Sequence, residues 1–158
     1  MFITVEGSGK VKRQMAADAA HWYAMHLMPR LQNKLFVNIK LIHNLEEKEG
    51  LSGDAIWEDD SCNRPREFTI RVDSSMSLAD MLMTVAHEMV HVKQYARGEL
   101  KDFSRNIKIC KWKGEVLECE KINYYDLPYE IEAHGREKGL FIRWFNQSQW
   151  KKCKWGNV

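Results

Sequence analysis

Residues 78–97 read LADMLMTVAHEMVHVKQYAR, and this stretch predicts a long amphipathic helix. Ser77, three residues before Asp80, is typical of a capped N-terminus, and Arg97 followed by Gly98 is typical of a helix end. One face of the helix would be an apolar stripe of Leu78, Leu82, Val85, Met89, Val92 and Ala96. We therefore expect this helix to pack against the core of the protein.

The same stretch contains HEMVH at residues 87–91, an H-E-x-x-H pattern. His87 and His91 lie one helical turn apart, on roughly the opposite side from the apolar stripe. Two imidazoles at this spacing can bind one tetrahedral zinc ion, and Glu88 can reach a water molecule without binding the metal. The pattern predicts Zn²⁺ as cofactor, His87 and His91 as ligands, and Glu88 as the general base of a metallopeptidase.

A catalytic zinc site usually has three protein ligands and one open position. Metzincins place a glycine and a third histidine shortly after the second one, where this chain has Gln94 and Arg97. Peptide deformylases use a cysteine ligand in a Glu-Gly-Cys-Leu-Ser pattern, which the surroundings of Cys62 do not match. The sequence thus excludes the metzincins, argues against a deformylase, and moves the search to the C-terminal third.

A second helix is expected from Pro128 to about residue 145, with Asp126 as its cap. At 100° per residue, Glu130, His134 and Glu137 share a face with the apolar residues of this helix. Glu132 falls on the opposite face. A carboxylate on an apolar face is costly unless it is paired or bound to a metal, so Glu130 is the better ligand and Glu132 the better surface residue.

The H-E-x-x-H pattern followed by a helix carrying Glu130-Ile131-Glu132-Ala133 resembles the gluzincin metallopeptidases. The stretch from Trp112-Lys113-Gly114 through Leu127-Pro128-Tyr129-Glu130-Ile131-Glu132-Ala133 resembles small SprT-like or phage-encoded metallopeptidases. The resemblance covers roughly residues 66–145. It implies a zincin-like fold and a glutamate as third ligand.

Two departures from these families bear on His134. It stands one turn beyond Glu130, where gluzincins commonly have an Asp or Asn that orients the site, so the resemblance implies a role for His134 in catalysis. True SprT proteins use a third histidine, often in His-Gly, and usually have a zinc ribbon. His134-Gly135 fits the first feature, whereas the chain has no C-x-x-C pair. Glu130 is the preferred third ligand, and His134 is the alternative.

The chain of 158 residues, 44% of them hydrophobic, is long enough for one core, and we expect a single domain over residues 1–158. The expected class is α+β: a small zincin-like domain whose short, mostly antiparallel sheet packs against an N-terminal helix, the H-E-x-x-H helix and a C-terminal glutamate helix. The expected segments are a flexible arm (1–10), a helix (11–34), strands (36–42, 55–57 and 67–73), a possible hairpin (111–118), and a basic aromatic tail (146–158).

We expect a peptide or protein substrate, bound in extended form along residues 67–73 as an edge strand. Two alternatives remain. One is a SprT-like protein that acts on or binds DNA-associated proteins; the other is a non-catalytic, zinc-stabilised nucleic-acid-binding module that uses the tail from Trp150 to Trp155. Glu88 favours catalysis, because a closed structural zinc site has no use for a base.

The formal charge of +2, from 24 basic and 22 acidic residues, gives the whole chain no strong attraction to nucleic acid. No run approaches the roughly 18–20 apolar residues of a membrane span. We expect a monomer in the cytoplasm, or in the host cytoplasm if a phage encodes it. The four cysteines are expected as free thiols, although Cys110 and Cys119 flank the possible hairpin and could form a bridge when oxidised. Tyr95, Tyr124 and Tyr125 lie near the two key helices in the sequence and could donate to a developing oxyanion, but packing is the favoured role for each.

Overall fold

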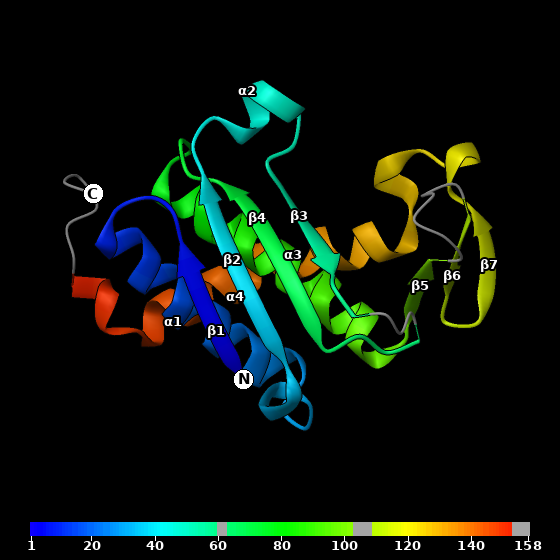
Figure 1. The fold of residues 1–158 in the computed structure, drawn as a ribbon, viewed down its shortest axis with the longest axis horizontal. Helices are drawn as coiled ribbons and strands as arrows, with labels where there is room; N and C mark the ends of the chain where they lie inside the picture. Colours follow the sequence, from blue (N-terminus) through cyan, green and yellow to red (C-terminus); the bar gives the residue numbers. More distant parts are fainter. Residues whose placement is uncertain (60–62, 103–108, 153–158) are drawn as a thin grey trace.

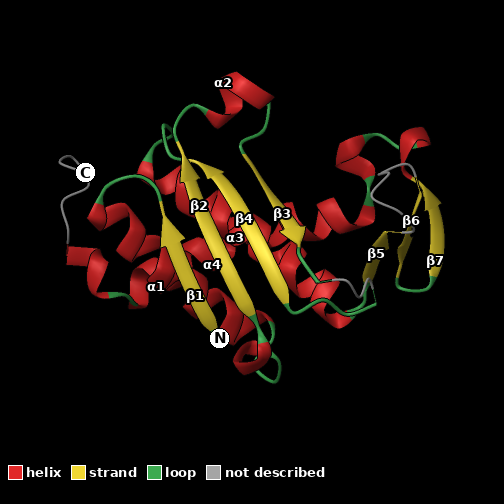
Figure 2. Cartoon of the chain, viewed as in Figure 1, coloured by secondary structure: helices red, strands yellow, loops and turns green. Residues whose placement is uncertain are grey.

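The structure is a computed structural model that describes residues 1–59, 63–102 and 109–152. It is an α+β arrangement in which two long helices cover one face of a four-stranded sheet, a third long helix packs on these two, and a small three-stranded sheet lies at one end (Figures 1 and 2). The helices are α1 (Lys10–Leu27), α2 (Leu45–Glu49), α3 (Leu78–Arg97) and α4 (Pro128–Gln147). The strands are β1 (Phe2–Glu6), β2 (Phe36–Ile42), β3 (Gly53–Trp57), β4 (Glu67–Asp73), β5 (Leu100–Asp102), β6 (Ile109–Trp112) and β7 (Glu115–Glu118).

The larger sheet has the order β1-β2-β4-β3, and only β3 runs antiparallel to its neighbour. The expected mostly antiparallel sheet is therefore wrong for the sheet that carries the helices. The physical reason is the long crossovers: α1 returns the chain between β1 and β2, and α2 with β3 returns it between β2 and β4, so these strands start at the same end. The small sheet, β5-β6-β7, is antiparallel.

Two further expectations about strands are wrong. Residues 2–6, expected within a flexible arm, form β1, since Ile3 and Val5 alternate toward the core while Phe2 and Thr4 face outward. β4, expected at the edge, lies between β2 and β3, and β3 is the edge strand. The alternation of apolar residues identified β4 as a strand, but that pattern carries no information about which strands flank it.

The two site-bearing helices follow the sequence closely. The Ser77 side chain accepts a hydrogen bond from the Asp80 backbone N–H, and Gly98 ends α3 in the left-handed conformation with φ of 70°. α4 begins at Pro128 as expected, but the Asp126 cap is wrong because Leu127 occupies the cap position and makes no side-chain cap. α1 ends at Leu27 instead of near residue 34, since Pro29 disfavours helical geometry just before it.

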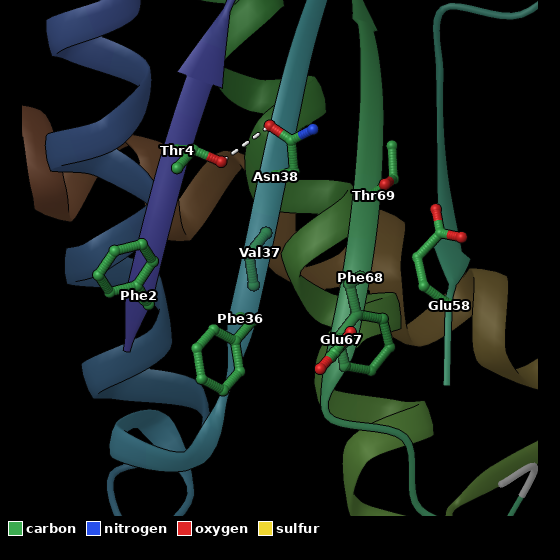
Figure 3. A pocket seen from close by; sticks show the side chains of 9 residues that line it. All are labelled: Phe2, Thr4, Phe36, Val37, Asn38, Glu58, Glu67, Phe68 and Thr69. Carbon is green, nitrogen blue, oxygen red and sulfur yellow. Dashed lines mark hydrogen bonds between the residues drawn. The ribbon is translucent and has the colours of Figure 1, made fainter. Parts of the chain in front are cut away.

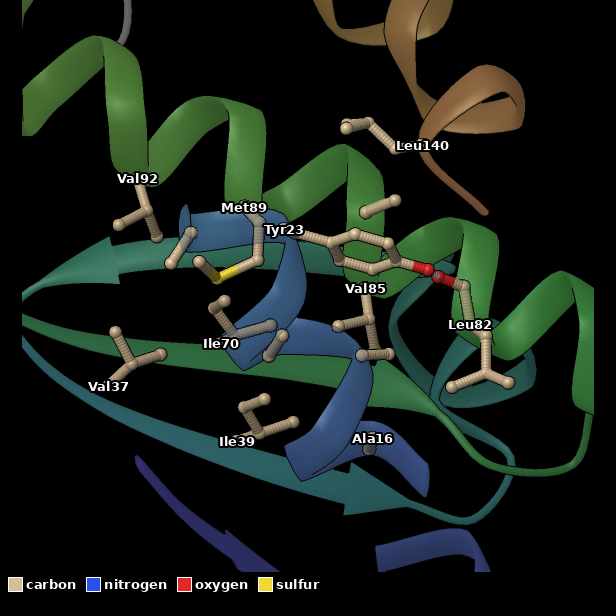
Figure 4. Close-up of a cluster of buried hydrophobic side chains, with 14 of the residues drawn as sticks. Ala16, Tyr23, Val37, Ile39, Ile70, Leu82, Val85, Met89, Val92 and Leu140 are labelled. Carbon is tan, nitrogen blue, oxygen red and sulfur yellow. Dashed lines mark hydrogen bonds between the residues drawn. The ribbon is translucent and has the colours of Figure 1, made fainter. Parts of the chain in front are cut away.

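The core lies between the sheet and the helices. Figure 4 shows Val85, Met89 and Val92 of α3 facing Val37, Ile39 and Ile70 of the sheet. The Tyr23 ring of α1 reaches α3, where its hydroxyl donates to the Leu82 carbonyl. Each of these side chains is at most 2% exposed, and burial of a Val, Ile or Met side chain contributes about 1.5–3 kcal/mol. The apolar stripe expected on residues 78–97 is confirmed.

The opposite face of the sheet is polar and partly open. A shallow hollow of about 220 Å³ lies on this face. Among the side chains that line it, Figure 3 shows the Phe2 and Phe36 rings at one end and Thr4 hydrogen-bonded to Asn38 at the other. The two rings are 6.0 Å apart between centroids. This hollow lies on the side of the sheet away from α3, so the two histidines do not reach it.

A second hydrophobic cluster lies around the small sheet. The hairpin expected between Cys110 and Cys119 is confirmed as β6 and β7, with Lys113 and Gly114 at positive φ in its turn. Both cysteines are buried free thiols, with their Sγ atoms 2.9 Å apart. Cys62 and Cys153 fall outside the described residues. Among those that are described, no helix combines the length and the hydropathy of a membrane span.

The first part of the segment expected as a tail (146–158) is helical in the structure. α4 continues to Gln147, and a short 3-10 turn follows at Gln149–Lys152. The Trp150 indole N–H donates to Asp18 of α1 at 3.1 Å, so this ring is docked on the domain. The rest of the tail, including Trp155, lies outside the described residues.

We predict that Gly53→Ala destabilises the protein by about 1–3 kcal/mol, because the strand passes α3 too closely for a side chain. A Cβ at this position would lie 2.6 Å from Thr84 Cγ2 and 3.0 Å from the Arg71 carbonyl oxygen. Denaturant unfolding measures the change. Gly135→Ala is the matched control: open space surrounds it on α4, and it should add about 0.5–1 kcal/mol. Adding Thr84→Ser to the Gly53 variant should restore part of the loss, and a loss-free Gly53→Ala would contradict the close approach.

Candidate metal centre

α3 and α4 lie side by side, and three buried side chains meet between them. The His87 and His91 Nε2 atoms are 3.1 Å apart, and Glu130 Oε2 lies 3.2 Å from the first and 3.5 Å from the second. All three residues are less than 9% exposed. Two ligands about 2.0–2.1 Å from an ion, at a tetrahedral angle, would be about 3.3–3.4 Å apart. The observed triangle therefore has the size of one face of a tetrahedral metal site.

Each imidazole has its other ring nitrogen held by an acceptor. His87 Nδ1 lies 2.8 Å from Glu137 Oε2. His91 Nδ1 lies 2.8 Å from Gln94 Oε1, while the Gln94 amide NH₂ donates to the Tyr129 carbonyl and to Glu132. Since the acceptors are a carboxylate and an amide oxygen, both Nδ1 atoms must carry the proton.

With their protons on Nδ1, neutral imidazoles present bare Nε2 lone pairs to each other and to the Glu130 carboxylate. Three electron-rich atoms within 3.5 Å repel one another unless a cation or a proton lies among them. The chemistry of this donor set, two imidazole nitrogens and one carboxylate oxygen, fits a divalent transition metal. The group His87, His91 and Glu130 could thus hold a metal ion.

The pKa values of the three residues reflect the same crowding. Burial alone lowers the pKa of His87, but its hydrogen bonds with Glu130 and Glu137 outweigh burial and raise the pKa to about 10. The pKa of His91 is raised in the same way by Glu130 and Glu88, against the effect of burial. Burial favours the neutral form of Glu130, yet the two histidines and Tyr124 bring its pKa well below the usual range. Without a metal, protons take the place of the cation.

Tyr124 completes the surroundings of Glu130. Its hydroxyl donates to Glu130 Oε2 at 2.7 Å, and burial together with this bond raises the pKa of the phenol. The sequence favoured a packing role for Tyr124, and this contact at the site is a different outcome. Tyr95 bonds to Asp102, and the Tyr125 side chain is largely exposed, so neither of these phenols contacts the three candidate ligands.

Glu88 lies beside the metal centre and is 4% exposed. In the part of the chain that is described, no hydrogen bond reaches its carboxylate. Burial raises its pKa to about 7, and the two neighbouring histidines partly oppose this rise. Because Gly53 has no side chain, the Glu88 carboxylate fits beside it. A Cβ at residue 53 would lie 3.2 Å from Glu88 Oε1. A carboxyl group with a pKa near neutrality is suited to exchange protons with a substrate.

His134 is close to the candidate metal centre but does not belong to the group of His87, His91 and Glu130. Its ring centroid lies 4.5 Å from that of His87, and its Nδ1 is 3.3 Å from Glu137 Oε2. Its side chain is 39% exposed, so the sequence-based placement on the inward face holds only for its edge. A second, more open group of His87, His134 and Glu137 also has ligand-like spacing, but within it Glu137 already accepts a hydrogen bond from His87 Nδ1.

The prediction that Glu132 is a surface residue is wrong. Its carboxylate receives hydrogen bonds from Gln94 and from the buried Lys93, and Arg136 lies at 3.1 Å. Lys93 also pairs with Glu99 at 2.6 Å. Helical periodicity placed Glu132 away from the apolar face of α4, but that side of α4 still packs against the C-terminal half of α3. Through Gln94, this ion-pair group holds His91 in position.

Sequence reasoning did not assign Glu137 or Gln94 to the site. The signal for Glu137 was present, because it shares a helix face with Glu130. Gln94 lies three residues after His91, within reach of its Nδ1, but spacing alone does not distinguish this contact from an exposed amide. Comparisons with family models, with curated proteins and with solved structures find no match to this chain. The functional argument therefore depends on the geometry.

We predict that Glu137→Gln lowers the affinity for zinc by about 10- to 100-fold, because an amide orients His87 less strongly than a carboxylate does. Competition with a chromophoric chelator measures the affinity. Glu115→Gln, which removes one exposed carboxylate on β7, is the control for net charge and should have no effect. An unchanged affinity in Glu137→Gln would show that this contact does not support the metal.

We also predict that zinc binding strengthens as pH rises. The raised pKa values of His87 and His91 mean that metal must displace one or two protons, so the dissociation constant should fall about 10- to 100-fold per pH unit. Chelator competition between about pH 6.5 and 7.5 tests this. A dissociation constant independent of pH would mean that both imidazoles are already neutral.

Proposed function

We propose that this protein is a zinc-dependent metallopeptidase of the gluzincin type. The observation that supports the proposal most strongly is the buried triangle of His87, His91 and Glu130, with both Nδ1 protons fixed by acceptors and with Glu88 beside it. The group offers three ligands, as catalytic zinc sites commonly do. A structural zinc would instead need a fourth protein ligand, and the described residues supply none within this group.

A zinc ion bound by these residues would act as a Lewis acid on a peptide carbonyl and lower the pKa of water. Glu88 is the general base in this proposal: its carboxylate takes a proton from water and transfers it to the departing amine. Glu137 and Gln94 keep the imidazoles in the tautomer that ligation requires. Tyr124, which touches Glu130, and His134, at the cleft, are the residues proposed to hydrogen-bond the substrate.

The proposed place for the substrate backbone moves from residues 67–73 to β3. Asp73 N–H donates to the Ser52 carbonyl and Glu58 N–H donates to the Glu67 carbonyl, so even-numbered residues of this region bond to β4. By the alternation of an antiparallel pair, the backbone groups of Gly53 and Ala55 point to the free edge. An extended peptide could add to this edge beside Glu88.

The nucleic-acid alternative has no specific support. Trp150 is docked on α1, and the remaining aromatic and basic residues of the tail fall outside the described residues. SprT-like action on DNA-associated proteins remains a variant of the peptidase proposal, one in which the substrate is bound to DNA.

We predict that Glu88→Gln keeps the metal and the fold but lowers peptide hydrolysis by about 10²- to 10⁴-fold, because the amide cannot accept the proton. The test is cleavage of a broad peptide library by zinc-loaded protein, read by mass spectrometry, with metal content measured on the same samples. Glu115→Gln again serves as the control. Equal turnover in Glu88→Gln and wild type would remove Glu88 from the mechanism, and no cleavage by wild type would contradict the proposed function.

A further inference from the structure

We propose that the cleft beside the metal centre selects peptides with a Lys or Arg side chain next to the bond that is cleaved. This inference rests on the proposed peptidase function and names its substrate class. The cleft has a volume of about 600 Å³ and lies where the start of α3 and the middle of α4 face α2 and the first residue of β3. This volume is within the range of small-molecule sites and is ample for one long side chain.

Apart from His87 and His134, the ionisable side chains that line the cleft are all acidic or tyrosine phenols. Its lining includes the carboxylates of Glu46, Asp80, Glu88 and Glu137, and no Lys or Arg lines it among the described residues. Arg71, on the neighbouring strand, is engaged by its ion pairs with Asp54 and Glu49. A cationic side chain entering this space would therefore meet carboxylates without displacing a resident cation.

The carboxylates differ in their free capacity. Glu137 is bonded to His87 and lies near His134, and Asp80 accepts from the Ser77 hydroxyl. Glu46 is exposed, and within the described chain no hydrogen bond or ion pair of its carboxylate is found. Asp80 lies about two turns before His87 on α3, and Glu46 lies on α2. Neither is a candidate ligand, so a guanidinium or ammonium group could be attracted to these distal carboxylates without competing for the metal.

Two observations other than charge point to a ligand here. The Glu88 carboxylate is 4% exposed, lines the cleft and has no hydrogen bond from the described residues, so it is free to accept one from a group that enters the cleft. Gly53 lines the same cleft, and its backbone groups point to the free edge of β3. A peptide held on that edge would have side chains directed into the cleft.

The apolar part of the lining fits the stem of a basic side chain. Leu51, Met83 and the Thr84 methyl group also line the cleft, and Met83 and Thr84 lie on α3 between Asp80 and His87. Lys and Arg bury their methylene groups against apolar surface while the charged end reaches polar partners. A glutamate side chain would instead be repelled, and norleucine would leave the carboxylates without a partner.

The test is the binding of three fluorescein-labelled alanine hexapeptides, which carry one Arg, one norleucine or one Glu at the same position. The full chain as Glu88→Gln, loaded with zinc, prevents cleavage during the measurement of fluorescence anisotropy. We expect the Arg peptide to bind about 5- to 10-fold more tightly than the norleucine peptide, as two partly exposed ion pairs would provide, and the Glu peptide to bind most weakly.

Glu46→Gln and Asp80→Asn should each reduce the preference for Arg, and Glu115→Gln should leave it unchanged. Since Glu46 is exposed, its variant is expected to fold even if the Asp80 variant, next to the α3 cap, does not. Equal binding of the three peptides, or a preference for Arg that is as large in Glu46→Gln as in the parent protein, would overturn the inference. Cleavage of a neutral peptide by wild-type protein would then still support the peptidase. Selective Arg binding without any hydrolysis by wild type would support the selective cleft and contradict the proposed function.

Discussion

The candidate metal centre depends on one constraint: two imidazoles one turn apart on α3 must point their Nε2 lone pairs at the same place. Left alone, each histidine could turn away or, as a neutral ring, carry its single proton on Nε2 instead of Nδ1. Glu137 and Gln94 prevent this by accepting from the two Nδ1 atoms, so the repulsion between the Nε2 atoms is built into the folded protein. Folding stabilises an arrangement that is unfavourable until a cation or protons enter, which is how a protein prepares a metal site in advance.

The packing of α4 on α3 makes that arrangement possible. Glu130, Glu132 and Glu137 all come from α4; Glu130 and Glu137 contact His87 of α3, and Glu132 contacts Lys93 further along the same helix. The buried Lys93 ties Glu132 and Glu99 together, and this group holds Gln94 against His91. Taking one partner from such a buried ion group costs several kcal/mol, so these contacts fix the register of the two helices.

The sequence predicted the parts of the protein whose signals are local. The bounds of α3, its Ser77 cap, its Gly98 end and the strand nature of residues 36–42 and 67–73 all followed from periodicity and capping chemistry. The parallel pairing of β1, β2 and β4 did not, because neighbour identity depends on crossovers that single-strand patterns do not record. β1 was not predicted, because the glycine-rich turn at residues 7–9 that follows it is also typical of a flexible arm.

In the site, too, the contacts set by local spacing were predicted and those set by helix packing were not. Helical spacing was enough to bring Glu130 to His87 and His91, whereas the contacts of Glu132 and Gln94 depend on how α4 crosses α3. Glu132 lies opposite the apolar stripe of α4, and for that reason the sequence placed it on the surface. In the structure that side of α4 contacts α3, and Glu132 bonds to Lys93 and Gln94 there. The sequence placed His134 near His87, and the two rings are close in the structure. Helical spacing did not show that this edge of α4 is open to solvent, where the His134 side chain is 39% exposed.

The central claim is that the Nε2 atoms of His87 and His91 and a carboxylate oxygen of Glu130 bind one metal ion. The most direct test is a crystal structure of the zinc-loaded protein with anomalous differences collected on both sides of the zinc absorption edge. The account predicts one peak between α3 and α4, about 2.0–2.2 Å from each of these three atoms. A peak bound by His134 in place of Glu130, or no peak between the two helices, would contradict it.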